Sequence, residues 1–169
     1  MLIETERLLL RPLLAGDIGQ LVELWSDSDV TRYLDGPKNP DDVRRALEGE
    51  LQEQPPGEFE LWPVVEKSTG AVVGHCGLLE KDVQGNSEVE LVYVFSCRVW
   101  GRGYAVEIGR ALIDLAFNQL LLGRIVSLIE PANAASRRVA LKLGMRSEGA
   151  IQRPGNRVLE LYVLGSDGA

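Results

Sequence analysis

The sequence of 169 residues has only two cysteines, one histidine and 6% aromatic residues, and these scarcities exclude several classes of protein. Cys76 and Cys97 are too few for a disulfide framework or a zinc site, so we expect no metal. No apolar run approaches the ~20 residues of a membrane span, and the first residues lack a basic start followed by an apolar stretch. We therefore expect a cytoplasmic protein with no membrane contact.

Basic residues are also in deficit, since 18 Lys and Arg stand against 25 Asp and Glu and give a net charge of −7. A broad basic surface, and with it binding of nucleic acid, is therefore not expected. The excess of acidic over basic residues is confined to residues 1–60, which contain 14 Asp and Glu and 6 Lys and Arg. This acidic first part either forms solvated helix faces or faces a cationic partner.

The remaining composition, 45% apolar and 25% charged residues, is typical of a soluble globular protein, and the length fits one domain over 1–169. Apolar periodicity predicts a mixed sheet with helices on its faces, in the order β-α-α-β-β-β-α-β-α-β-β. Strands are expected over 7–13, 59–66, 71–79, 88–95, 124–130, 145–152 and 158–164. Helices are expected after Asp17, over 41–54, from 104 to about 121 and from Asn133 to Leu143, with a short helical turn over 30–34.

The strongest chemical signal is the glycine-rich turn that joins the strand over 88–95 to the next helix. A helix start exposes backbone N–H groups, and Gly101 and Gly103 let a phosphate approach the main chain closely. Arg98 and Arg102 add positive charge beside the turn. The pattern predicts an anion, such as phosphate, at a helix N-terminus; the alternative is a tight structural turn. Neither the P-loop nor the dinucleotide fingerprint is present, because Val106 stands where the latter needs a third small residue.

Four blocks in this order resemble the GNAT acetyltransferases: residues 90–93, 100–105, 133–136 and 142–145, which read ELVY, WGRGYA, NAAS and KLGM. The opening ETERLLLRP at 4–12 is similar to the RimJ/RimL branch, which acetylates protein N-terminal amines. The resemblance extends from about residue 3 to 164. It implies an α/β GNAT fold: a mixed, mostly antiparallel sheet of about seven strands with about four helices, splayed at the central strands.

The resemblance also implies acetyl-CoA as co-substrate, with its pyrophosphate on the main chain of residues 101–105 and its pantetheine arm along the strand near residues 94–96. A bulge near residues 92–94 is expected at the splay, where a backbone N–H would polarise the thioester carbonyl. The implied cofactor-binding residues are Val94, Phe95, Ser96, Arg98, Trp100, Gly101, Arg102, Gly103, Tyr104, Ala105, Asn133, Ser136 and Arg138.

Two residues are candidates for proton transfer. Many GNAT enzymes have a tyrosine that acts as the general acid at the position of Ala140. Ser136 resembles the alternative proton donor of the RimJ/RimL branch. Glu90 matches the acidic position of that branch and is the candidate base, directly or through a water. Glu88, on the same side of the strand, and His75, the only histidine, are the alternatives. Each of these residues could instead be structural.

The resemblance implies transfer of an acetyl group to an amine by direct attack in a ternary complex, because no activated nucleophile is evident. The acceptor is either a protein N-terminal amine or a small cationic amine such as a polyamine or aminoglycoside. A non-catalytic acyl-CoA-binding module is the remaining alternative. Trp25, Tyr33 and Trp62 either line the acceptor side or pack internally. The branch often forms homodimers.

Overall fold

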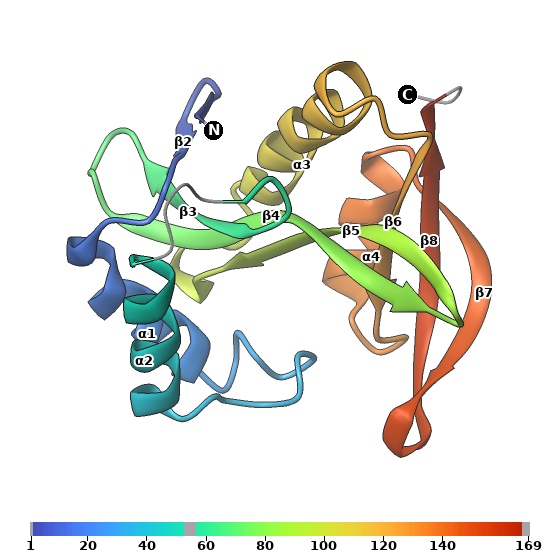
Figure 1. The fold of residues 1–169 in the computed structure, drawn as a ribbon, viewed down its shortest axis with the longest axis horizontal. Coiled ribbons are helices and arrows are strands. Elements are labelled where there is room, and N and C mark those ends of the chain that lie inside the picture. The colour runs from blue at the N-terminus through green and yellow to red at the C-terminus, as the bar shows by residue number, and fades with distance from the viewer. Residues whose placement is uncertain (1, 53–56, 167–169) are drawn as a thin grey trace.

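The computed structural model describes residues 2–52 and 57–166 and has one eight-stranded sheet in the order β1-β2-β3-β4-β5-β6-β8-β7 (Figure 1). The strands are β1 (Ile3–Glu4), β2 (Leu8–Leu10), β3 (Leu61–Glu66), β4 (Val72–Val83), β5 (Asn86–Phe95), β6 (Arg124–Ile129), β7 (Arg146–Arg153) and β8 (Arg157–Gly165). The helices are α1 (Ile18–Ser26), α2 (Pro40–Glu50), α3 (Tyr104–Asp114) and α4 (Ala134–Lys142). Among these residues no helix combines the length and apolar character needed to cross a membrane.

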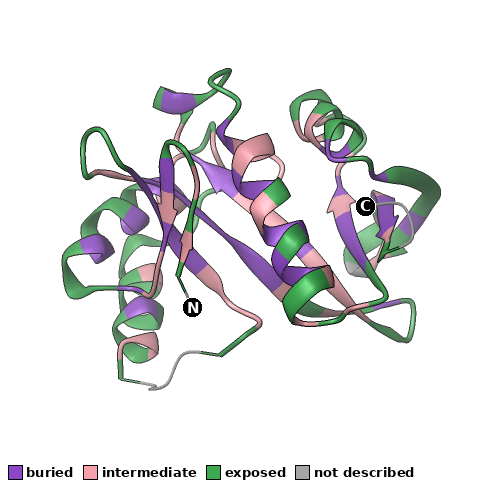
Figure 2. Cartoon of the chain, turned by 90° about the horizontal axis from the view of Figure 1, so that it is seen from above, coloured by how far each residue is buried: buried purple, intermediate pink, exposed green. Residues whose placement is uncertain are grey.

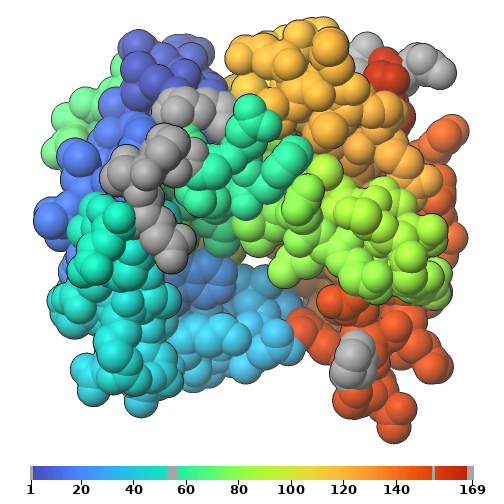
Figure 3. All heavy atoms as spheres, in the orientation of Figure 1, coloured from blue at the N-terminus to red at the C-terminus, as the bar shows by residue number. Residues whose placement is uncertain are grey.

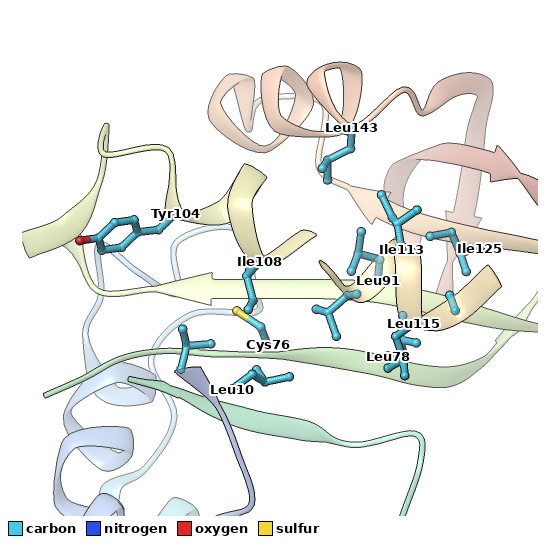
Figure 4. Packing of buried hydrophobic residues seen from close by; sticks show 14 of the residues in the cluster. Leu10, Cys76, Leu78, Leu91, Tyr104, Ile108, Ile113, Leu115, Ile125 and Leu143 are labelled. Atoms are coloured by element: carbon cyan, nitrogen blue, oxygen red, sulfur yellow. The ribbon is translucent and has the colours of Figure 1, made fainter. Parts of the chain in front are cut away.

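The helices lie on opposite faces of the sheet because side chains alternate along each strand. Val92 and Val94 of β5 pack with α1 and α2 on what we call the first face. Leu91 and Phe95 point to the second face, where they join α3 and α4. Figure 4 shows this second core, with Leu91 beside Ile108 of α3. Figure 2 shows the resulting division of α3 into a buried and an exposed side.

The predicted order of elements and the mixed, mostly antiparallel sheet are confirmed. Among the strands of the described residues, β5 and β6 are the one pair that runs parallel. The predicted end of α4 is confirmed as well: Gly144 follows it with φ of +84°, a left-handed conformation that glycine adopts without steric cost. The eighth strand is the short β1, which pairs with β2 through Ile3 and Leu10 and lies outside the predicted strands.

The predicted short helical turn is present: the Thr31 N–H donates to the Asp27 carbonyl at 3.0 Å, and Asp35 and Gly36, with left-handed φ values of +69° and +78°, prevent a longer helix. Two other local predictions were wrong. Helix α2 ends at Glu50 instead of 54, and residues 53–54 of the predicted helix lie outside the described residues. Asp17 precedes α1, but its carboxylate bonds Arg11 and the Leu14 N–H instead of capping the helix.

Candidate active site

The candidate site begins where β5 and β6 diverge. The two strands pair only at Glu90 and Val126, and beyond this point they separate, which confirms the predicted splay. The pairing of β4 with β5 keeps its register over all described residues from Gly74 opposite Phe95 to Val83 opposite Asn86. The predicted bulge near residues 92–94 is therefore wrong, and beyond Glu90 side-chain hydrogen bonds link β5 to β6 where backbone hydrogen bonds stop.

Side-chain hydrogen bonds join the two halves of the sheet across this gap. The Ser127 hydroxyl donates to the Leu91 carbonyl at 2.8 Å, on the second face. On the first face, the Leu128 N–H donates to the Glu90 carboxylate at 3.2 Å. Hydrogen bonds from side chains thus take the place of backbone bonds, and they hold the gap at a defined width.

The register decides which main-chain groups of β5 face the gap. The Ser96 N–H donates to the Val73 carbonyl on β4, and groups pointing to one neighbour alternate along an antiparallel strand. Val94 and Ser96 therefore direct their main-chain groups to β4. Tyr93 and Phe95 direct theirs toward the gap, where the described residues offer no ladder partner beyond Glu90. The Phe95 carbonyl accepts a 2.8 Å hydrogen bond from the Trp100 indole.

The turn from β5 to α3 presents a group of unpaired main-chain donors. The first helical hydrogen bond of α3 runs from the Glu107 N–H to the Gly103 carbonyl at 3.0 Å. Within the described part of the chain, no acceptor lies against the N–H groups of Gly101, Gly103, Tyr104 and Ala105. Gly101 and Gly103 have φ values of +78° and +82°. These left-handed residues aim successive N–H groups in one direction, which suits an anion.

A buried carboxylate on a neighbouring strand holds this turn in place. Glu66, at the end of β3, accepts hydrogen bonds from the Tyr104 hydroxyl at 2.6 Å and from Arg102 at 3.1 Å. Hydrogen bonds from Tyr104 and Thr69 hold the pKa of Glu66 below its ordinary value. The charge of Arg102 is thus shared with Glu66, whereas Arg98 is exposed beside the turn.

The N-terminal segment braces the same turn from the side. Arg7 forms an ion pair with Glu107 of α3 at 2.6 Å and donates to the Arg102 carbonyl at 3.0 Å. Its guanidinium also lies 4.7 Å from the centre of the Tyr104 ring. Glu107 accepts a further hydrogen bond from Thr5 at 2.6 Å. The turn is therefore preorganised by three segments that are far apart in the sequence.

Glu90 lies on the first face at the point where the gap opens. Burial raises the pKa of Glu90 above that of an ordinary glutamate, and the Leu128 N–H with the charges of Lys81 and Arg153 offsets this only in part. This shift brings the pKa of the carboxylate closer to the pKa of an amine, which favours proton transfer between them near neutral pH. Glu88 occupies the same face, but it forms an ion pair with Arg124 at 2.9 Å.

His75 is held by hydrogen bonds at both ring nitrogens. The Trp25 indole donates to Nδ1 at 3.0 Å, so Nε2 carries the proton and donates to the Leu61 carbonyl, also at 3.0 Å. Burial lowers the pKa of His75 to about 4. The imidazole is therefore neutral at pH 7, with no lone pair left to accept a proton from an amine. This arrangement supports a structural role.

We expect His75 to make the stability of the protein depend on pH. The unfolded chain takes up a proton near pH 6.5 and the folded chain only near pH 4, so the free energy of unfolding falls as the pH falls. Between pH 7.5 and 5 the loss should be about 2 kcal/mol. Urea unfolding of the wild type and His75→Gln at both pH values measures it. A loss of equal size in His75→Gln would contradict this assignment.

The loop into α4 closes the second face of the gap. The Asn133 side chain accepts the Ser136 N–H at 3.1 Å and so caps α4. The Tyr93 hydroxyl donates to the Ser136 carbonyl at 3.1 Å. Arg138 is exposed on α4, and Ala140 is fully buried. Tyr93 was not predicted as a site residue, because its alternation with Leu91 and Phe95 is that of a core position.

A groove of about 490 Å³ lies on the first face between the helices and the sheet. Its apolar walls come from α1 and α2 on one side and from β3, β4 and the residues before β3 on the other: Trp25, Val43, Ala46, Leu47, Phe59, Leu61 and Leu79. His75 lies at its base, and Lys38, Glu50 and Glu60 also line it. Of the aromatic candidates, Trp25 lines this groove, while Trp62 is buried in the core of the second face.

The segment between α1 and α2 reaches the C-terminal hairpin and bounds the first face. Arg157, at the start of β8, forms an ion pair with Asp35 and donates to the Tyr33 carbonyl at 2.7 Å. Figure 3 shows the two segments, in blue and red, meeting below β5. The acidic residues of the first part are often paired as well, as in Asp29 with Arg32 and Asp42 with Arg45. Such pairing weakens the case for a broad attraction of cations.

Neither cysteine adds chemistry to the site. Cys76 is fully buried, and burial raises the pKa of its thiol, so it stays protonated. Cys97 is a free, exposed thiol beside the turn. Over residues 2–52 and 57–166 there is no cluster of three or more histidine, cysteine, aspartate or glutamate side chains that could hold a metal ion.

Comparison with known proteins gives the class of this fold and site. Residues 7–146 match the family described as the acetyltransferase (GNAT) domain. The match covers most of the chain, so the protein belongs to the GNAT family of acyltransferases, which transfer an acetyl group from acetyl-CoA to an amine.

The chain is also similar to two bacterial proteins and to a solved structure. The uncharacterized protein YkkB of Bacillus subtilis is 34% identical over 139 residues, which cover 82% of this chain and 80% of that protein. The uncharacterized N-acetyltransferase p20 of Bacillus licheniformis is 30% identical, with 95% of this chain and 92% of that one covered. The crystal structure of a GNAT-family acetyltransferase from Bacillus anthracis matches with a TM-score of 0.85 at 29% identity, covering 99% of both chains.

Proposed function

We propose that this protein acetylates an unprotonated primary amine, in particular the α-amine of a protein N-terminus, as in the RimJ/RimL branch. The observation that carries the proposal is the buried Glu90 carboxylate, with its raised pKa, at the opening between β5 and β6. An α-amine has a pKa near 8, against about 10.4 for a lysine side chain. A carboxylate base can therefore deprotonate the former at neutral pH with far less cost.

The cofactor would lie across the gap, along the free edge of β5. The pyrophosphate would accept hydrogen bonds from the main chain of residues 101–105, with Arg98 beside it and Trp100 covering the entry. Tyr93 and Phe95 would pair with the pantetheine arm, as an added strand does. Asn133, Ser136 and Arg138 would contact it from α4. The register supports main-chain contacts by Phe95 and Tyr93 in place of Val94 and Ser96.

The reaction would proceed in one direct displacement. Acetyl-CoA supplies the activated acetyl group, and a β5 N–H polarises its carbonyl oxygen. Glu90 accepts the amine proton, directly or through a water, while the new N–C bond forms and the C–S bond breaks. Glu90 and Tyr93 are three residues apart on β5, which is about 10 Å along the strand. Ser136 would donate the proton that the departing thiolate takes up, and it would regain a proton from solvent water.

Acetyl-CoA turnover on a panel of acceptors tests this function. Thiol release is measured at pH 7.5 with peptides that have a free or a blocked N-terminus, with N-blocked lysine peptides, and with small amines such as spermidine and kanamycin. We expect turnover with free N-termini and at least about tenfold less with N-blocked lysine peptides. Turnover confined to small amines would show that the acceptor is a metabolite or an antibiotic instead of a protein N-terminus. Acetyl-CoA binding without any turnover would support a non-catalytic module.

A further inference from the structure

The apolar groove on the first face continues directly to the proposed base. Leu79 lines the groove and is the cross-strand partner of Glu90 in the β4–β5 pair. Directly opposed residues of an antiparallel pair point to the same face with their Cβ atoms about 5 Å apart. A molecule whose amine lies at Glu90 would therefore extend its body over Leu79 into the groove.

The groove is built as a rigid apolar surface. Gly77 lies between His75 and Leu79 on β4, and a Cβ placed there would come within 1.9 Å of the Glu60 carbonyl oxygen. The chain before β3 is thus folded tightly onto the first face and forms one wall. The hydrogen bond from Trp25 to His75 fixes the base of the groove against the sheet. With both sides held in this way, the groove can select a side group by its shape.

The chemistry of the walls selects an apolar group. Trp25, Val43, Ala46 and Leu79 offer no hydrogen-bond acceptor to a ligand, and the Trp25 indole N–H is already donated to His75; the charged residues that line the groove are Lys38, Glu50 and Glu60. Against these four apolar side chains, a second ammonium or a row of hydroxyls would lose its water without gaining a hydrogen-bond partner, which is costly. Burying an aromatic or branched aliphatic group in the same place is favourable by about 1.5–3 kcal/mol.

We propose that the acceptor is a primary amine with a large apolar or aromatic group next to the amine-bearing carbon, and that this group binds in the groove formed by α1, α2 and β4. The inference rests on the proposed function, because it takes the reacting amine to lie at Glu90. A peptide whose first residue is phenylalanine, leucine or methionine has this chemistry, and so does a free arylalkylamine. Polyamines and aminoglycosides do not.

The first experiment compares acceptors matched in all but the side group. Thiol release is measured with peptides that differ only in a first residue of phenylalanine, leucine, serine or glycine, and with 2-phenylethylamine, ethylamine and spermidine. We expect kcat/KM to be about tenfold to a hundredfold higher for the apolar member of each series. Activity on peptides alone would identify protein N-termini as the source, and activity on 2-phenylethylamine alone would identify a small molecule.

A second experiment places the side group in the groove. Ala46 of α2 lines it, and Ala46→Phe should fill it and reduce the preference for phenylalanine over glycine peptides at least about tenfold. Glu48→Phe is the matched control: it adds the same side chain to an exposed position on the other side of α2 and should keep the wild-type preference.

These outcomes separate the inference from the proposed function. Equal kcat/KM values for phenylalanine and glycine peptides, or a preference for spermidine, would overturn the apolar groove as a selecting site while leaving acetyl transfer intact. The same holds for a preference that Ala46→Phe leaves unchanged. Absence of turnover with every amine, despite acetyl-CoA binding, would overturn the proposed function itself and this inference with it.

Discussion

Replacing Glu90 with glutamine is expected to lower kcat by a factor of about 100 or more, the range that general-base catalysis contributes. Glutamine keeps the size and the hydrogen bond from Leu128 but cannot accept the amine proton. The affinity for acetyl-CoA should stay within about twofold of the wild type, because Glu90 is on the first face and the phosphate donors belong to the turn before α3. Thiol release and calorimetric titration of acetyl-CoA measure the two quantities.

The pH dependence distinguishes a base from a merely structural carboxylate. Burial raises the pKa of Glu90, so activity should fall on acidification at a pH above the ordinary pKa of a glutamate. Glu90→Gln should lack this acidic limb. Glu88→Gln is the matched control, since Glu88 is on the same face but is paired with Arg124. If Glu88→Gln loses the limb and Glu90→Gln keeps it, the two roles are reversed.

Replacing Gly103 with valine is expected to weaken acetyl-CoA binding at least tenfold. Gly103 has φ of +82°, a conformation that costs other residues about 1–2 kcal/mol. A Cβ added at this position would lie 3.7 Å from a guanidinium nitrogen of Arg7. The turn would rearrange, and the N–H groups of Tyr104 and Ala105 would lose their common direction. Each lost hydrogen bond to a charged group is worth about 1.5–3 kcal/mol.

The control for Gly103→Val is Gly85→Val. Gly85, in the β4–β5 hairpin, has a similar φ of +84°, and a Cβ there would meet nothing within 4 Å. Both variants carry the same backbone strain, and only one is near the proposed phosphate site. Calorimetry with acetyl-CoA should show a raised Kd for Gly103→Val alone. Unchanged binding in Gly103→Val would mean that the pyrophosphate lies elsewhere.

Local patterns predicted most of the fold because each needed only neighbouring residues. The alternation over 88–95 placed β5, and the two glycines marked the start of α3. The phosphate turn was visible for the same reason, since its donors belong to consecutive residues. Glu90 was found through its likeness to a family position, and the raised pKa that supports it depends on burial in the folded protein, which no local pattern reveals.

The features of the site that the sequence did not predict depend on contacts between residues far apart in the chain. The ion pair of Arg7 with Glu107 and the bond of Tyr104 to Glu66 brace the turn across 100 and 38 positions. Tyr93 could not be separated from a core residue, because only the fold brings its hydroxyl to Ser136. The bulge was wrongly predicted because a splay can also arise when side chains such as Ser127 take over backbone hydrogen bonds.

The most direct test of the proposed cofactor site follows main-chain amides by ¹⁵N NMR while acetyl-CoA is added. We predict saturable shifts at Tyr93 and Phe95 of β5 and at Gly101, Gly103 and Ala105 of the turn, with little change at Gly85. This result would place the cofactor along the free edge of β5 and on the N-terminus of α3. Saturable shifts confined to other segments, with Tyr93 and Gly103 unmoved, would contradict the site.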